Sequence, residues 1–237
     1  MKTVIIFGLG KIADVAYQHI VRDRAYEVVA FTCDAEWLPK GDQGSTFYGR
    51  PVVPFEEIER LYPPESVSMF VAIGYHDLNA VRAAKCDAAK AKGYRLISYV
   101  SPRADHGPWL DVGENCLILD SVGIQPGVRI GNNVSLWNNA LVGHHSIVDD
   151  HCWIAAGATL GGGVTLGARS FVGLNATIGG ELSIGAASFL GAASLVLKSA
   201  PPRSVFIAPG TEKFRLDSNA FLRMTRMPAL GSATSKG

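Results

Sequence analysis

Residues 141–196 read LVGHHS IVDDHC WIAAGA TLGGGV TLGARS FVGLNA TIGGEL SIGAAS FLGAAS LV, a six-residue repeat with an aliphatic residue in the second place of every block. The spacing extends back to Val112, so that fifteen positions, each six residues after the last, carry valine, isoleucine or leucine. Glycine follows this residue in nine of the fifteen cases, and a small or compact residue stands four places after it. A sustained short period indicates a solenoid, whose repeats bury their apolar side chains against one another.

Each hexad is expected to form a short strand and a bend, and successive turns of the coil pair in register. The aliphatic side chain points inward, and the small residue fills the remaining interior. We expect glycine to supply the backbone angle that the corner requires. The sequence therefore predicts a parallel β-helix over residues 103–200. Because a solenoid needs both ends covered, the preceding domain and the segment 201–237, of which 229–237 look disordered, are the expected caps.

The first hundred residues have a different pattern, in which apolar β-branched runs alternate with helical stretches. The expected strands are 3–7, 26–31, 68–73 and 94–100, and the expected helices are 11–21, 54–61 and 77–92, the last with Asp77 as its N-cap. Such alternation is typical of a parallel sheet with Rossmann-like topology. We therefore expect an α/β, Rossmann-like domain over residues 1–102.

A glycine loop, Gly8-Leu9-Gly10, follows the first expected strand. Glycines let the backbone approach a phosphate, and the N-terminus of the following helix supplies N–H groups. Asp34 ends the second strand, where an acidic residue can bind a ribose hydroxyl. Ala13 stands where a dinucleotide motif has its third glycine, so a tight turn without a ligand remains an alternative. A mononucleotide or nucleotide-sugar site fits a domain of this size better than an NAD site.

Composition excludes several classes of partner. The 22 basic and 21 acidic residues give a formal charge of +1 and are scattered, so no nucleic-acid groove is expected. No apolar run is long enough to span a bilayer, and the apolar start is too short and too interrupted by charge for a signal peptide. The four cysteines form no CxxC pair, which favours a reduced, cytoplasmic protein.

Two adjacent histidines, His144 and His145, interrupt the repeat at outward-facing or corner positions, with Trp137 and Asn139 before them and His151 after. An imidazole titrates near neutral pH, so it can take the proton of an amine or hydroxyl that attacks a thioester. Backbone N–H groups at glycine-rich corners can stabilise the oxyanion that develops. We therefore expect His144 to be a general base that His145 and Asn139 position; solvated surface histidines are the alternative.

The chain resembles the hexapeptide-repeat acyltransferases, and most closely the bacterial nucleotide-sugar acyltransferases of the PglD and NeuD type. The resemblance rests on the repeat and on the segments IIFGLG, VAIGYHD, VGHHSIVDDHCWIAAGA and FVGLNATI. It implies a left-handed coil with three hexads per turn and a homotrimer with active sites between subunits. It also implies transfer of an acetyl or similar short acyl group from acetyl-CoA, without a metal. The acceptor would be an amino or hydroxyl group of a nucleotide-linked sugar, for O-antigen, other surface polysaccharide or glycan synthesis.

The resemblance also assigns individual positions. The family's catalytic histidine falls on His144, and the next residue, often a glutamate in the family, is His145 here. A second family histidine, which contacts the acetyl group, falls on Trp153. The expected coenzyme-binding residues are Trp153, Gly162, Leu174 and Ala192. The expected substrate-binding residues are Gly8, Gly10, Lys11, Asp34, Ile73, Gly74, Tyr75 and Trp137.

The sequence leaves three other functions open. A zinc enzyme of the carbonic anhydrase type would use His144, His145 and His151 as ligands. Adjacent histidines on an extended backbone point to opposite sides, which argues against a shared metal. An NAD-dependent oxidoreductase would use GLGKIA and Asp34 but would leave the β-helix without a role. A non-catalytic scaffold would leave the histidine cluster unexplained.

Overall fold

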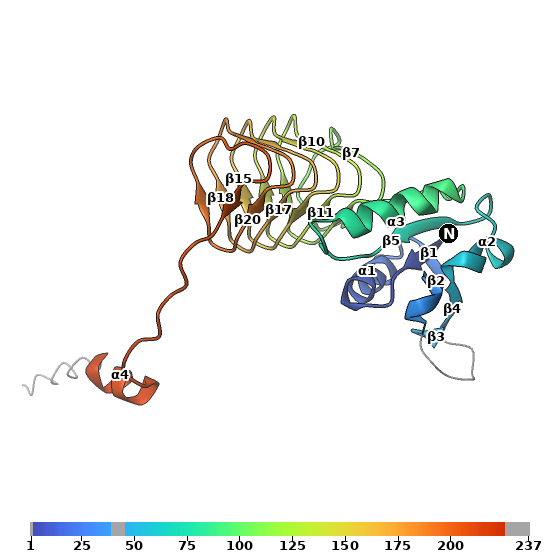
Figure 1. The fold of residues 1–237 in the computed structure, drawn as a ribbon, viewed down its shortest axis with the longest axis horizontal. Helices are drawn as coiled ribbons and strands as arrows, with labels where there is room; N and C mark the ends of the chain where they lie inside the picture. The colour runs from blue at the N-terminus through green and yellow to red at the C-terminus, as the bar shows by residue number, and fades with distance from the viewer. Residues whose placement is uncertain (1, 39–45, 226–237) are drawn as a thin grey trace, which may run out of the picture.

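The computed structural model describes residues 2–38 and 46–225, which form an α/β unit followed by a parallel β-helix (Figure 1). The elements of the first unit are β1 (Thr3–Phe7), α1 (Lys11–Arg22), β2 (Glu27–Cys33), η1 (Ala35–Trp37), β3 (Thr46–Phe47), β4 (Arg50–Pro54), η2 (Phe55–Glu57), α2 (Ile58–Leu61), β5 (Ser68–Val71) and α3 (Ala80–Ala91). Its sheet has the order β3-β4-β2-β1-β5. Only β3 runs antiparallel to its neighbour, so the sheet is mixed.

Helices cover both faces of this sheet, which explains the uninterrupted apolar run of β1. Val4 and Ile6 pack on the side of α1, in a core with Ile20. Ile5 and Phe7 face the opposite side, where α2 and α3 lie. Alternate residues of one strand therefore enter two different cores, and the carboxyl ends of β1, β2 and β5 are left open at the edge of the unit.

Three corrections apply to the expected elements of this unit. The segment 54–61 is a 3₁₀ turn and one turn of α2, and the preceding strand β4, which pairs with β2, was not expected. Asp77 is not the N-cap of α3: it has a positive φ, as do the next two residues, and the helix begins only after Asn79. The expected strand 94–100 contributes one bridge, Met69 to Leu96, to this sheet.

The rest of that segment, β6 (Tyr99–Val100), pairs with the β-helix instead. The two-residue strands that follow are β7 (Asp111–Val112), β8 (Leu117–Ile118), β9 (Gly123–Ile124), β10 (Arg129–Ile130), β11 (Ser135–Leu136), β12 (Leu141–Val142), β13 (Ile147–Val148), β14 (Trp153–Ile154), β15 (Thr159–Leu160), β16 (Thr165–Leu166), β17 (Phe171–Val172), β18 (Thr177–Ile178), β19 (Ser183–Ile184), β20 (Phe189–Leu190), β21 (Leu195–Val196) and β22 (Val205–Phe206).

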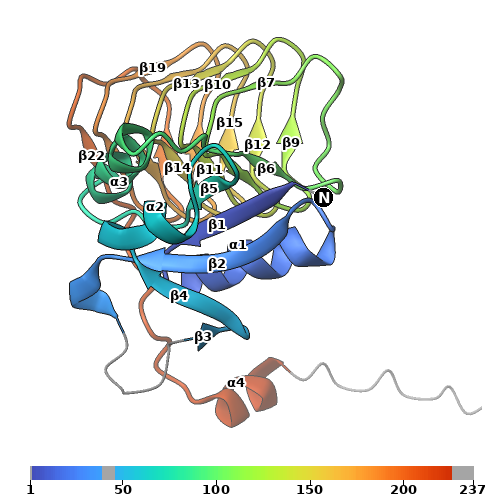
Figure 2. The same cartoon turned by 90° about the vertical axis from the view of Figure 1, so that its right-hand side faces the viewer.

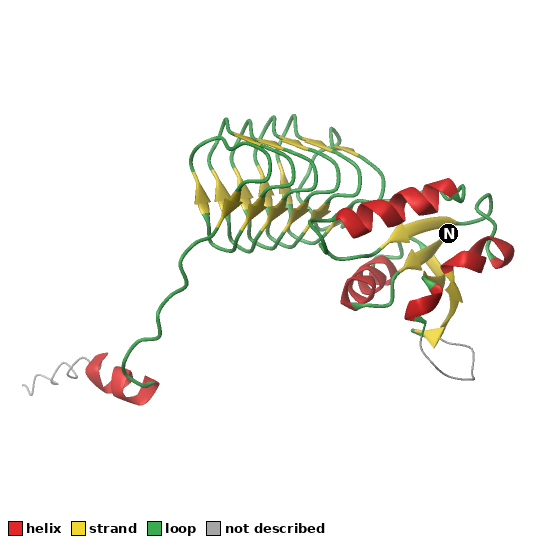
Figure 3. Ribbon diagram, in the orientation of Figure 1, coloured by secondary structure: helices red, strands yellow, loops and turns green. Residues whose placement is uncertain are grey.

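Each strand of the coil pairs in parallel with the strand eighteen residues later, as Ile130 does with Val148 and Leu136 with Ile154. One turn therefore contains three hexads, and three parallel sheets form its faces (Figure 3). This arrangement fits a left-handed β-helix. Every repeat aliphatic from Ile118 to Val196 lies in one continuous core, so the predicted inward orientation is confirmed.

Three corners separate these sheets. The docking corner is residues 113–115, 131–133, 149–151 and 167–169; the histidine corner is 125–127, 143–145, 161–163 and 179–181; the third corner is 119–121, 137–139, 155–157, 173–175 and 191–193. At each, the left-handed backbone angle belongs to the third residue after the aliphatic, for example Asn115, Asn133 and His145. Asparagine tolerates this conformation well. The expectation that the glycine directly after the aliphatic supplies the angle is wrong.

That glycine is required for a different reason, which is close approach between turns. A Cβ on Gly167 would lie 2.5 Å from the backbone nitrogen of Ala186. Real side chains do not reach such a distance without displacing the backbone. The exception is Gly179, whose added Cβ would have its nearest neighbours at 3.5 Å, an ordinary contact.

These two glycines form a matched pair for a stability test. Gly167→Ala is expected to lower the free energy of unfolding by about 1–3 kcal/mol, because the backbones of two turns must separate. Gly179→Ala should leave it unchanged or raise it by up to about 1 kcal/mol, because alanine restricts the unfolded chain. Urea unfolding measures both, and equal losses in the two variants would contradict the close-approach explanation.

Beyond the coil, β22 pairs with β20, and the chain then leaves the body and reaches α4 (Ser218–Thr225), which stands apart in both views (Figures 1 and 2). The disorder expected at 229–237 falls outside the described residues. Among the helices of residues 2–38 and 46–225, none combines the length and hydropathy needed to cross a bilayer.

Polar side chains fix the α/β unit to the docking corner, where α3 lies against the β-helix (Figure 2). Asn115 binds the backbone of Val71 through both amide atoms, accepting from its N–H at 2.7 Å and donating to its carbonyl at 3.0 Å. Arg82 of α3 enters the same corner, where it is 2% exposed, and donates to Asn133 Oδ1 at 2.8 Å and to the carbonyl of Gly74 at 3.4 Å. Burial lowers the pKa of Arg82 to about 10.

Candidate functional site

A pocket of about 870 Å³ opens at the carboxyl ends of β1, β2 and β5. Its lining includes all seven residues that the sequence assigned to substrate binding in this unit: Gly8, Gly10, Lys11, Asp34, Ile73, Gly74 and Tyr75. The strand-end rule for open α/β sheets predicted this location. Sequence reasoning missed Trp37, His76 and Lys85, which also line the pocket. His76 lies within the segment VAIGYHD, in the loop after β5. No motif marks Trp37 or Lys85, because they enter from η1 and from α3.

The pocket has the geometry and charge of an anion site. Gly8 has a φ of +123°, and a Cβ there would lie 2.8 Å from the carbonyl oxygen of Ala72, so only glycine fits. Gly10 is the N-cap of α1, whose first residue is Lys11. Lys85 Nζ lies 2.7 Å from Asp34 Oδ1 and balances that carboxylate. The N-terminus of α1 together with Lys11, which forms no ion pair with the residues that the structure describes, favours a phosphate.

The second candidate region is the histidine corner, where His144 and His145 are both exposed. Their Nδ1 atoms lie 3.2 Å apart, with ring planes at 76°. His145 has a φ of +59°, so the two side chains do not alternate as they would on an extended backbone. The expectation that they point to opposite sides is therefore wrong. The backbone N–H of His144 donates to Gln125 Oε1 at 2.9 Å, which ties this turn to the preceding one.

Glycines of the neighbouring turns leave room for both rings. A Cβ on Gly162 would lie 2.4 Å from Cε1 and Nε2 of His144, and a Cβ on Gly127 would lie 2.8 Å from Cδ2 of His145. Each imidazole therefore rests against a bare backbone. The N–H of Gly162 has no acceptor among the hydrogen bonds of the described residues, so it is available beside the His144 ring. Gly162 was expected at the coenzyme site, and it lies directly against the expected base.

Other expected site residues lie elsewhere on the same chain. Asn139 and Trp137 are on the third corner, as are the expected coenzyme residues Leu174, which is 55% exposed, and Ala192. Within one chain, Asn139 is therefore not at the histidine corner. The buried Nε1 of Trp137 has no hydrogen-bond partner in the described part of the chain, which leaves one N–H donor unsatisfied.

Trp153, expected at the acetyl group, is 4% exposed and lies on the sheet face beneath the α/β unit. Its ring packs against Tyr75, at 5.3 Å between centroids, and against Trp137, at 5.2 Å. Tyr75 also lines the pocket, so Trp153 supports the pocket wall. In a single chain it does not reach His144.

His151 does not join the other two histidines. It is on the docking corner, where its Nδ1 lies 2.9 Å from the side-chain amide of Asn133. That amide nitrogen can only donate, so Nδ1 accepts. Burial lowers the pKa of His151 and favours this neutral state. The three histidines that a zinc site would need are therefore divided between two corners.

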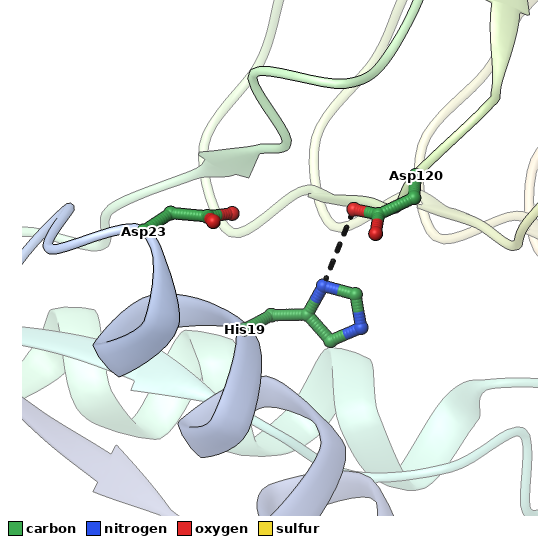
Figure 4. Close-up of side chains that lie close together, drawn as sticks. All are labelled: His19, Asp23 and Asp120. Atoms are coloured by element: carbon green, nitrogen blue, oxygen red, sulfur yellow. Dashed lines mark ion pairs between the residues drawn. The ribbon is translucent and has the colours of Figure 1, made fainter.

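In the described residues, one group of potential metal ligands comes together: His19, Asp23 and Asp120 (Figure 4). Both carboxylates are already bound by guanidinium groups. Arg22 lies 2.9 Å from Asp23 and 2.8 Å from Asp120, and Arg103 bridges the same pair. Burial, reinforced by Arg22, lowers the pKa of His19. The cluster is an ion-pair network that joins α1 to the first turns of the β-helix.

Comparison with known proteins agrees with this architecture. The family model for bacterial transferase hexapeptide repeats (six repeats) matches residues 111–144. No curated protein matches the chain. A mutant of perosamine N-acetyltransferase from Caulobacter crescentus, solved with CoA and GDP-perosamine, is 26% identical, with a TM-score of 0.77 over 86% of this chain and 93% of that one.

Two further structures are similar over the same extent. PerB from Caulobacter crescentus, in complex with CoA and GDP-perosamine, is 25% identical, with a TM-score of 0.63 over 86% of this chain and 93% of that one. The acetyltransferase domain of PglB from Neisseria gonorrhoeae is 23% identical, with a TM-score of 0.72 over 85% and 94%. Residues 111–144 therefore match the bacterial transferase hexapeptide repeat, and the chain is similar, over most of its length, to solved structures of perosamine N-acetyltransferase.

Proposed function

We propose that this protein transfers an acetyl group, or a similar short acyl group, from acetyl-CoA to an amino or hydroxyl group of a nucleotide-linked sugar. The observation that carries the proposal is that one chain pairs a pocket lined by Gly8, Lys11 and the N-terminus of α1 with an exposed histidine pair. The fold is similar to that of N-acetyltransferases solved with CoA and GDP-perosamine. Neither a zinc enzyme nor an oxidoreductase accounts for both features.

The α/β unit, residues 1–102, would be a Rossmann-like domain that holds the nucleotide. Lys11 and the N-terminus of α1 would bind the phosphates, since helix N-termini favour anions. Asp34 would accept a hydrogen bond from a ribose hydroxyl, as acidic residues at this strand end do. Trp37, which is 71% exposed at the pocket, offers an aromatic face to the base.

The β-helix, residues 103–200, would supply the chemistry, and β22, which pairs with β20, would close its C-terminal end. Nε2 of His144 takes the proton of the sugar's amino or hydroxyl group as that group attacks the thioester carbonyl. The N–H of Gly162 donates to the resulting oxyanion. The tetrahedral intermediate then breaks its carbon–sulfur bond, the acetyl group stays on the sugar, and His144 returns the proton to the coenzyme A thiolate.

The separation of pocket and histidines within one chain supports a homotrimer with active sites between subunits. In such an assembly the histidine corner of one subunit faces the pocket of its neighbour. Leu174 and Ala192, on the third corner, would contact coenzyme A, and Trp137, Asn139 and Trp153 would complete the substrate wall. The four cysteines are buried and free, as in a reducing compartment, so we place this enzyme in the cytoplasm, in surface polysaccharide or glycan synthesis.

Calorimetric titration tests the two binding steps separately. The full-length protein is expected to bind acetyl-CoA, and separately nucleotide sugars, with the corresponding sugar lacking its nucleotide showing no measurable heat. Lys11→Ala should weaken binding of the nucleotide sugar and leave acetyl-CoA unaffected. A protein that binds no acyl-CoA at all would overturn the transferase proposal.

A further inference from the structure

Asn115, Asn133 and His151 occupy the same place in three successive turns of the docking corner, each with a left-handed backbone angle. Their side chains form a hydrogen-bonded column, and Arg82 reaches into it from α3. We propose that this column is an acid-sensitive contact between the two units. When His151 takes up a proton, its hydrogen bond with Asn133 breaks, and α3 and the pocket loop, residues 72–79, loosen from the β-helix. This inference concerns the free protein and does not depend on the reaction.

The direction of each hydrogen bond in the column is fixed by groups that act in one way only. Asn115 accepts from the N–H of Val71 at 2.7 Å and donates to its carbonyl at 3.0 Å, so Nδ2 of Asn115 is the atom that donates to Asn133 Oδ1, at 2.9 Å. A guanidinium has donors only, and Arg82 Nε lies 2.8 Å from the same Oδ1. Asn133 therefore presents Nδ2 to His151, whose Nδ1 accepts at 2.9 Å. The neutral ring then carries its proton on Nε2.

A proton on Nδ1 of His151 cannot be accommodated in this column. It would place two N–H donors 2.9 Å apart. Turning the Asn133 amide over does not restore the bond, because its NH₂ group would then face Arg82 and Asn115, which both donate. Asn133 is 1% exposed, so water does not take the place of the lost acceptor. The protonated ring must therefore leave the column, and the amide that seats Arg82 loses its partner.

A small cavity of about 110 Å³ beside His151 can receive the protonated ring, since two carboxylates, Asp87 of α3 and Asp150 of the same corner, are among its lining residues. Burial lowers the pKa of His151, and this outweighs the two carboxylates, which raise it. The charged groups that face the ring are Asp150 and Arg169 from the coil and Arg82 and Asp87 from α3, and the cavity is also lined by the ion pair of Lys90 with Glu114.

Arg82 connects this column to the pocket. Its Nη1 donates to Asn79 Oδ1 at 3.1 Å and to the carbonyl of Gly74, a pocket residue, at 3.4 Å. Three successive residues of the pocket loop, 77–79, have positive φ, including Leu78 at +45°. A bulky residue rarely adopts this conformation, and contacts with the surrounding structure must hold it there. A loosened Arg82 therefore releases a wall of the pocket.

The sign of the pH dependence follows from the lowered pKa. The opened contact takes up its proton near the ordinary pKa of histidine, 6.5, and the closed contact does so only at lower pH. The closed form is therefore fully favoured above pH 6.5 and loses stability as the pH falls below that value, by up to about tenfold in the opening equilibrium for each pH unit.

Hydrogen exchange of the full-length protein measures this loosening. His151→Asn is the matched variant, because its Oδ1 takes the place of Nδ1 as acceptor, does not titrate, and tolerates the left-handed angle as Asn115 and Asn133 do. At pH 5.5 residues 72–91 should exchange at least about threefold faster in the natural protein than in this variant, and at pH 7.5 equally fast. Residues 177–196 of the coil should exchange alike in both. His19, whose pKa is also lowered, is present in both proteins, so its effect cancels.

A second variant and an NMR measurement keep the test independent of how well asparagine fits. His151→Ala has no acceptor, and alanine already stands with a left-handed angle in the same column at Ala187, so residues 72–91 should exchange fast at both pH values. Two-bond proton–nitrogen correlation of the natural protein at neutral pH should show Nε2–H on His151. Nδ1–H on that ring, equal exchange of the natural protein and His151→Asn at pH 5.5, or His151→Ala as slow as His151→Asn would each overturn the inference.

Discussion

His144→Ala is expected to lower kcat for acetyl transfer by about 10²–10⁴-fold, the usual contribution of a general base. The ring is exposed and rests on glycine, so its removal leaves no buried cavity, and the free energy of unfolding should change by less than about 0.5 kcal/mol. Binding of the nucleotide sugar should be unchanged, because the pocket lining does not include this residue. Steady-state kinetics and calorimetry on the same preparation give all three quantities.

A second variant tests the same base without removing any imidazole. The methyl group of Gly162→Ala would lie 2.4 Å from Nε2 and Cε1 of His144, so the ring must rotate away. The atoms that this methyl group would meet belong to the end of a side chain and not to the backbone, so rotation of the ring relieves the clash and the fold should survive. We expect kcat to fall at least tenfold. Gly179→Ala, one turn along the same corner, should keep full activity. Full kcat in Gly162→Ala, or in His144→Ala, would show that another group is the base.

The largest stability effect is expected at Arg82. Arg82→Met removes every donor that this side chain gives to the docking corner, leaving carbonyl oxygens of Gly74, Asn133 and His151 without it. These acceptors are buried or partly buried, and a buried acceptor left without a donor costs about 1–3 kcal/mol, so the free energy of unfolding should fall by about 3 kcal/mol or more. Relief of the desolvation of the guanidinium offsets part of this loss.

Arg60→Ala is the matched control for this measurement. Arg60 is 81% exposed at its side chain and forms one contact, at 3.8 Å, with Glu57. Exposed ion pairs of this kind contribute little to stability, so the free energy of unfolding, measured with urea, should change by less than about 0.5 kcal/mol. An Arg82→Met protein as stable as Arg60→Ala would mean that Arg82 does not hold the two units together.

The repeat could be predicted from the sequence because burial of one aliphatic residue per hexad leaves little freedom in the coil. The role of its glycines could not be predicted, because it depends on how closely their backbone approaches the next turn, about eighteen residues away in the sequence. The contact between His144 and His145 follows from the left-handed residue at each corner. Asparagine at positions 115, 133 and 139 is the sequence signal for that conformation.

The pocket was predicted because glycines and an aspartate directly follow apolar strands, and the carboxyl ends of parallel strands meet at one edge. The burial of Arg82 was not predicted, since α3 carries several other charged residues and only the contact with the docking corner shows which one is buried. The family pattern predicted Trp153 at the acetyl group. Its burial could not be predicted, because it depends on how the α/β unit packs over this face of the β-helix.

Acetyl transfer itself is the central claim, and mass spectrometry of the product tests it most directly. The protein, incubated with acetyl-CoA and a panel of amino- and hydroxyl-bearing nucleotide sugars, should release free coenzyme A and yield one nucleotide sugar that has gained a single acetyl group. The His144→Ala protein should yield almost none over the same time. Binding of both ligands without an acetylated product from any member of the panel, or an equal yield from His144→Ala, would contradict the account.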